Sequence, residues 1–181
     1  MIHPAANRFA RLMLPGDGYY AVRRVWRQLK GWDFDETYSV RFPDRRDLVS
    51  YKVQDGVRLD VFWKVLSIGR GPAFSLFIHD EEVMRFDCFG AGEGHFHLAL
   101  SAPGEPAESR LWFHEQSVRD QIDRSLFELS SNLDYFLERH PSSRVRDVRI
   151  DPVQMKSVCD RARSDAIRFL ETRPELSGLD G

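Results

Sequence analysis

The chain has 181 residues, of which 42% are hydrophobic and 30% charged, and its aromatic side chains include 13 Phe and 4 Trp. This much core-forming material excludes an intrinsically disordered chain and fits a single compact domain. The formal net charge of −2 excludes a strongly cationic coat for nucleic acids or membranes. Residues 1–52 are mildly basic, with ten Arg and Lys against six Asp and Glu, which fits either an anionic partner or a solvated helix face.

A soluble, cytoplasmic protein is expected. Near the N-terminus, Arg8 and Arg11 interrupt the apolar stretch and no small-residue cleavage site follows, so no secretion signal is predicted. No apolar run approaches the roughly 20 residues that a membrane span needs. The two cysteines, Cys88 and Cys159, do not form a disulfide framework and are expected to be free thiols.

The hydrophobic spacing predicts one helix followed by a series of strands. The helix covers residues 19–30, after the turn-rich PGDG and before Gly31. From Thr37 the period changes to two, and Asp55-Gly56 is a strong hairpin signal. The expected strands are 37–42, 48–53, 57–66, 73–79, 82–89, 95–100 and 110–114, with a turn at 69–72 and a loop at 101–109. Because no helix interrupts these strands, they predict an antiparallel meander.

The C-terminal third returns to helical spacing. A helix over residues 118–137 begins after Ser117 and ends at His140-Pro141, and a second begins at Asp151-Pro152. The predicted fold class is α+β: a curved antiparallel meander packed by the C-terminal helices, with an additional N-terminal helix. We expect a single domain over 1–181, with an N-terminal helical and basic extension (1–50), the sheet (51–114) and the C-terminal helices (115–181).

The stretch RFDCFGAGEGHFH, residues 85–97, is the best candidate for a functional site. Side chains alternate along a strand, so Arg85 shares a face with Asp87, and His95 shares one with His97. A hairpin loop with an odd number of residues, three or five around Gly90 to Gly94, places the two polar pairs on the same face. The same register gathers the apolar residues of both strands on the other face. Burial therefore favours the register that assembles the polar cluster. The apolar residues concerned are Phe86, Cys88, Phe96, Leu98 and Leu100.

Three chemistries could use such a cluster. His95 and His97 could act as general acid and base, with Asp87 orienting a ring and Arg85 binding phosphate. Alternatively, His95, His97 and Asp87 or Glu93 could hold a divalent metal such as Zn²⁺. Third, the alternate glycines could form an anion-binding nest, although their context matches no known phosphate-loop pattern. The structural alternative is a set of cross-strand ion pairs around a glycine-rich turn.

From Val53 to about Leu137 the chain resembles the TumE-type toxins of bacterial toxin-antitoxin pairs. The resemblance rests on "DG", "FWKV" and above all "RFDCFGAGEGHFH", which follows a pattern of Arg-aromatic-Asp, glycine loop and acidic-His-x-His. The chain departs from that pattern at Cys88 and Phe96. The resemblance implies a small α+β toxin whose functional set is Arg85, Asp87, Glu93, His95 and His97.

The leading hypothesis is a toxin-like bacterial protein that acts on RNA. In it, His95 and His97 are the acid/base pair, Arg85 binds phosphate, Asp87 orients an imidazole, and no cofactor is needed. A protein antitoxin is the expected partner of such a toxin. One alternative is a non-enzymatic interaction module, or a homo-oligomer, whose polar strip is structural. Another is a metal-dependent hydrolase with a His-x-His site.

Overall fold

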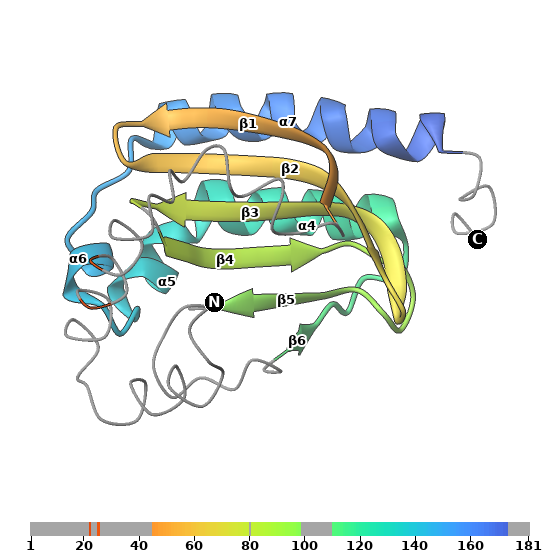
Figure 1. The fold of residues 1–181 in the computed structure, drawn as a ribbon, viewed down its shortest axis with the longest axis horizontal. Helices are drawn as coiled ribbons and strands as arrows, with labels where there is room; N and C mark the ends of the chain where they lie inside the picture. Colours follow the sequence, from red (N-terminus) through yellow and green to blue (C-terminus); the bar gives the residue numbers. More distant parts are fainter. Residues whose placement is uncertain (1–21, 23–24, 26–44, 80, 99–109, 174–181) are drawn as a thin grey trace.

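The computed structural model describes Val22, Val25 and residues 45–79, 81–98 and 110–173. Its strands form one antiparallel sheet in the order β1-β2-β3-β4-β5-β6, and four helices follow them in the chain (Figure 1). The strands are β1 (Arg45–Gln54), β2 (Val57–Leu66), β3 (Gly69–Ile78), β4 (Glu81–Asp87), β5 (His95–Leu98) and β6 (Leu111–Trp112). The helices are α4 (Val118–Ser131), α5 (Leu133–Glu138), α6 (Ser143–Arg146) and α7 (Pro152–Thr172). The predicted α+β meander with C-terminal helices is confirmed.

Several predictions fall outside the described residues. They are the strand over 37–42, the last two residues of the strand over 95–100 with Leu100, and the loop over 101–109. Most of the helix over 19–30 also lies outside, and only Val22 and Val25 are described, both of them helical and exposed. The sheet itself begins at Arg45, with β1.

One face of the sheet packs against α4 and α7, which lie side by side behind it in Figure 1. Because side chains alternate along a strand, every second residue of β2, β3 and β4 enters this core. The largest of these are Trp63, Phe74 and Phe86, all fully buried. The helices supply the other side of the core, with small residues on α7 that allow close packing. The helical core residues include Ile122, Leu129, Val158, Ala162 and Ala166.

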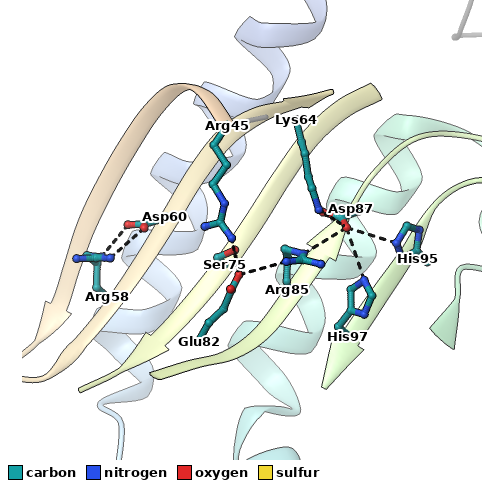
Figure 2. Close-up of polar contacts among 10 residues, drawn as sticks. All are labelled: Arg45, Arg58, Asp60, Lys64, Ser75, Glu82, Arg85, Asp87, His95 and His97. Carbon is teal, nitrogen blue, oxygen red and sulfur yellow. Dashed lines mark hydrogen bonds and ion pairs between the residues drawn. The ribbon is translucent and has the colours of Figure 1, made fainter. Parts of the chain in front are cut away.

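The opposite face of the sheet carries buried polar side chains, which is unusual for an interior. Asp60, Ser75 and Asp87 are fully buried there (Figure 2). A buried polar group needs a partner, since it otherwise loses its hydrogen bonds to water without compensation. This face is therefore where specific polar interactions position the candidate site.

Two local predictions need correction, and one short helix was not predicted. The residues expected to form a turn at 69–72 are instead the start of β3, and the turn is formed by Ser67 and Ile68. The helix expected over 118–137 is interrupted at Asn132, where α4 ends and α5 begins. The preceding Ser-Ser and Asn132 favour local hydrogen bonds over helix continuation, and the Asn132 amide donates to the Glu128 carboxylate.

The hydrophobic spacing did not predict the short helix α6. Both capped starts are confirmed, at Ser117 and Asp151.

Among the described residues no helix is long and apolar enough to cross a membrane. Both cysteines are free, as predicted, and both are buried.

Acid should destabilise the fold through His140, which follows α5 and is 5% exposed. Burial, helped by the nearby charge of Arg146, lowers the pKa of His140 to about 4. In the unfolded chain His140 is protonated below about pH 6.5, whereas in the folded chain it stays neutral down to about pH 4. The free energy of unfolding therefore falls as the pH falls from about 6.5 toward 4. Between pH 7 and 5 the loss from this residue is about 2 kcal/mol. In thermal unfolding across this range, His140→Gln should lose less stability than wild type. His114→Gln, a substitution at an exposed position, should lose as much stability as wild type does. Equal pH slopes for wild type and His140→Gln would contradict this assignment.

Candidate functional site

The register of β4 and β5 assembles the cluster that the sequence predicts. Asp87 pairs with His95, and Arg85 pairs with His97. The connection between the paired residues has seven residues, 88–94, so its parity is odd as predicted but its length exceeds the expected three or five. Phe86 and Cys88 face the helices, and the Phe86 and Phe96 rings stack with centroids 5.4 Å apart. Burial of this apolar pair fixes the polar side chains on the other face.

Asp87 lies at the centre of the cluster (Figure 2). Its Oδ2 atom is 3.4 Å from Nε2 of His95 and 3.8 Å from Nε2 of His97. Arg85 donates from Nε to the same oxygen at 3.3 Å. Asp87 is fully buried, and the two histidines are 1% and 4% exposed. Four of the five predicted site residues therefore meet at one carboxylate.

Glu93, the fifth predicted residue, contributes its backbone but not its carboxylate to the cluster. Its side chain is exposed in the turn between β4 and β5. Its carbonyl oxygen lies 2.8 Å from Nδ1 of His95. A carbonyl only accepts hydrogen bonds, so this Nδ1 carries the proton and the Nε2 of the neutral ring carries a lone pair.

Lys64 is a member of the cluster that the sequence analysis did not identify. It lies on β2, two strands from Asp87, yet its Nζ donates to both carboxylate oxygens, at 3.0 and 2.8 Å. Its side chain is 3% exposed and passes over β3. Gly71 and Ala73, which pair with Lys64 and Phe62, offer almost no side-chain volume on this face and leave room for the lysine.

Gly71 also allows the chain after Asp87 to approach β3 closely. A Cβ at this position would collide with the carbonyl oxygen of Cys88. The backbone N–H of Cys88 donates to the Pro72 carbonyl at 3.0 Å, which continues the attachment one residue beyond β4. Positions 71 and 73 are two residues apart and therefore lie on the same face of β3. Two small residues there are the sequence feature from which a long side chain crossing β3 could have been predicted.

The charges around Asp87 determine its protonation state. Burial by itself raises the pKa of this carboxyl, but the neighbouring Arg85 and Lys64 charges outweigh it and hold the pKa below its usual value. Burial lowers the pKa of the Lys64 ammonium, an effect that Asp87 partly offsets. Asp87 is therefore a carboxylate at neutral pH, held by two cationic side chains.

His95 is held as a neutral ring. Burial lowers its pKa and outweighs the hydrogen bond to the Glu93 carbonyl and the charge of Asp87, which both raise it. Its ring also lies among aromatic groups, with the Trp112 centroid at 5.4 Å and the Phe89 centroid at 5.8 Å. The His97 centroid is 5.0 Å away at an interplanar angle of 78°. At neutral pH the structure thus presents an unprotonated Nε2 beside an ionised carboxylate.

The glycine loop is anchored by Gln121 of α4, another residue that the sequence analysis missed. The Gln121 carboxamide accepts from the Gly90 N–H at 2.9 Å and donates to the Gly90 carbonyl at 2.9 Å. It also donates to the Glu115 carbonyl at 2.8 Å. A Cβ on Gly94, directly before His95, would push this carboxamide out of its present position. A glutamine within the apolar stripe of the predicted helix, beside Ile122, was the available signal.

Asp87, His95 and His97 form the group of described residues that could hold a metal ion. Each offers one ligand atom, and these atoms lie within 4.8 Å of one another. Two imidazole nitrogens and one carboxylate oxygen suit Zn²⁺ or another transition metal better than Mg²⁺ or Ca²⁺, which prefer oxygen ligands. The cluster can thus move protons or bind a transition metal, and the Nε2 atoms are central to both.

Comparison with models of protein families, with curated proteins and with solved structures finds no match to this chain.

The Gln121 anchor gives a direct test of how the loop is held. Gln121→Glu has the same shape but cannot donate to the carbonyls of Gly90 and Glu115, and it brings a buried charge. We expect the free energy of unfolding to fall by about 2 kcal/mol or more in urea denaturation. Gln116→Glu is the matched control, because Gln116 is exposed, and its effect should stay within about 0.5 kcal/mol. Equal effects at both positions would show that the anchor contributes nothing.

Proposed function

We propose that the protein is an enzyme that cleaves phosphodiester bonds in RNA, with His95 and His97 transferring the protons. The observation that carries this proposal is the convergence of both Nε2 atoms on the single carboxylate of Asp87, at 3.4 and 3.8 Å. An ionised carboxylate beside an imidazole stabilises the imidazolium that forms when the ring accepts a proton. Two such rings at one carboxylate provide both a base and an acid.

We assign His95 as the base and His97 as the acid. The hydrogen bond from Nδ1 of His95 to the Glu93 carbonyl leaves its Nε2 able to accept a proton. In metal-free RNA cleavage the base removes the proton of the ribose 2′-hydroxyl, and the 2′-oxygen attacks phosphorus. The bond from phosphorus to the 5′-oxygen breaks, and the acid protonates that oxygen. The products are a 2′,3′-cyclic phosphate and a free 5′-hydroxyl.

Arg85 is assigned to the phosphate. Its side chain is 18% exposed, more than that of Lys64, Asp87 or either histidine. A guanidinium can hold two phosphate oxygens at once and stabilise the charge that develops on them. Lys64 and Arg85 place two positive charges beside the one carboxylate, an excess that favours an anionic substrate.

The resemblance of residues 53–137 to TumE-type toxins supports a toxin-like role in a bacterial cell. All five residues of that pattern are present, and four of them, Arg85, Asp87, His95 and His97, meet at the carboxylate. A protein antitoxin is the partner that this role implies, and RNA is the substrate.

One observation favours a second candidate, a non-enzymatic interaction module. The polar strip continues across the sheet beyond Asp87 (Figure 2), where Glu82 accepts from Arg45 at 2.9 Å and from Ser75 at 2.6 Å. Arg58 pairs with Asp60 at 2.9 Å further along. Ion pairs of this kind can hold the sheet face together without any catalytic role.

The two candidates separate in an RNA cleavage assay with purified protein in the presence of a chelator. His97→Ala should lower the rate by about 10²-fold or more, because general acid–base groups typically contribute that much. His114→Ala, at an exposed position outside the cluster, should cleave as wild type does. A substrate with a 2′-deoxyribose at the cleaved position should be resistant, because it lacks the nucleophile.

Two results would overturn the proposal. If wild type and His97→Ala are both inert, or cleave equally fast, the acid/base assignment is wrong and the interaction module is favoured. If the chelator abolishes cleavage by wild type, the reaction depends on a metal.

A further inference from the structure

We propose that Asp87, His95 and His97 form a regulatory Zn²⁺ site, in which the metal replaces the Lys64 ammonium at the carboxylate and switches the acid/base pair off. The metal site is argued from geometry alone. The regulatory effect rests on the proposed function.

The distances in the cluster are close to those of a tetrahedral zinc site. With Zn–N and Zn–O bonds of about 2.0 Å, neighbouring ligand atoms in such a site lie about 3.3 Å apart. Nε2 of His95 is 3.4 Å from Oδ2 of Asp87, and Nε2 of His97 is 3.8 Å from the same atom. All three ligand atoms lie within 4.8 Å of one another, so the side chains must move closer together to bind one ion. The fourth position is left for water.

The orientation of His95 is that of a metal ligand. Metal-binding histidines donate their second ring N–H to a carbonyl or carboxylate, which fixes the tautomer and aims the lone pair. Nδ1 of His95 makes this hydrogen bond with the Glu93 carbonyl at 2.8 Å. That carbonyl belongs to the glycine loop, which Gln121 anchors to α4. The ligand is thus held in place by the backbone.

Lys64 is the cation with which a metal ion would compete at the carboxylate. Its Nζ contacts both oxygens of Asp87, at 3.0 and 2.8 Å, so in this structure the ammonium is the carboxylate's closest cation. A divalent ion bonded to Oδ2 repels an ammonium at the same carboxylate, so the two cations compete for Asp87. Lysine is able to yield, since its charge sits on a flexible four-carbon chain.

Metal binding and proton transfer exclude each other at this site. A Zn²⁺ ion uses the Nε2 lone pairs of His95 and His97, the same lone pairs that accept and deliver protons in the proposed reaction. The free enzyme, with Lys64 on Asp87, is the active state, and the zinc-bound enzyme is the inactive one.

The test measures metal binding directly, in the full-length protein, by competition with a chromophoric chelator and by the visible absorption of Co²⁺ as a substitute for Zn²⁺. Wild type should bind one ion per chain, and His97→Gln and Asp87→Asn should each lose this binding. Lys64→Met should bind Zn²⁺ about tenfold tighter or more, because it removes a competing cation. Lys52→Met, the same change at an exposed position on β1, should bind as wild type does. Thermal unfolding identifies any variant that fails to fold.

Several results would overturn the inference. They are the absence of Zn²⁺ binding by folded wild type, equal binding by folded His97→Gln, and unchanged affinity in Lys64→Met. The regulatory part is wrong if added Zn²⁺ accelerates RNA cleavage or leaves it unchanged. These failures are separate from that of the proposed function. If the protein binds Zn²⁺ but shows no chelator-resistant cleavage, the metal site is supported and the proposed function is not. If it cleaves RNA in the presence of chelator but does not bind Zn²⁺, the proposed function is supported and the metal site is not.

Discussion

The ionised carboxylate of Asp87, buried within the sheet, is the constraint on which the rest of the site depends. A charge removed from water costs several kcal/mol unless counter-charges and hydrogen bonds compensate for it. Here the compensation comes from Lys64 and Arg85, on two different strands. To bring a lysine from β2 to a carboxylate on β4, the strand between them must present almost no side chain, and Gly71 and Ala73 meet that requirement. The need to compensate the charge of Asp87 thus explains why β3 has a glycine and an alanine at positions 71 and 73.

The sheet separates two kinds of interior. On the helix side, Trp63, Phe74 and Phe86 pack against α4 and α7 and contribute through burial of apolar area. On the other side, ion pairs link β1 to β4, and their geometry matters more than their area. The apolar face tolerates exchanges of similar volume, whereas on the polar face the loss of one partner leaves a buried charge.

The face of the sheet on which Asp87 and both histidines lie could be predicted from the sequence. Phe86 and Phe96 pack on one face of the β4–β5 pair, which places Asp87 and the histidines on the other. The sequence was not sufficient to predict Lys64. Identifying that residue requires the registers of two successive strand pairs, and the glycines and Pro72 at the start of β3 were interpreted as a turn. The loop length was also wrong, because it is set by Gln121 on a helix distant in sequence and not by local turn preferences. The break at Asn132 depends on hydrogen bonds that hydrophobic spacing does not reveal.

All the members of the cluster, from Lys64 to His97, come from three consecutive hairpins of the meander. Each new strand pairs with the strand immediately before it, so the chain closes only short loops as it brings these residues together. The cluster can therefore take shape while the hairpins form in succession, ahead of the more distant contacts that α7 makes with β1 and β2. The order of the strands along the chain thus keeps the sequence separation between the members of the cluster small.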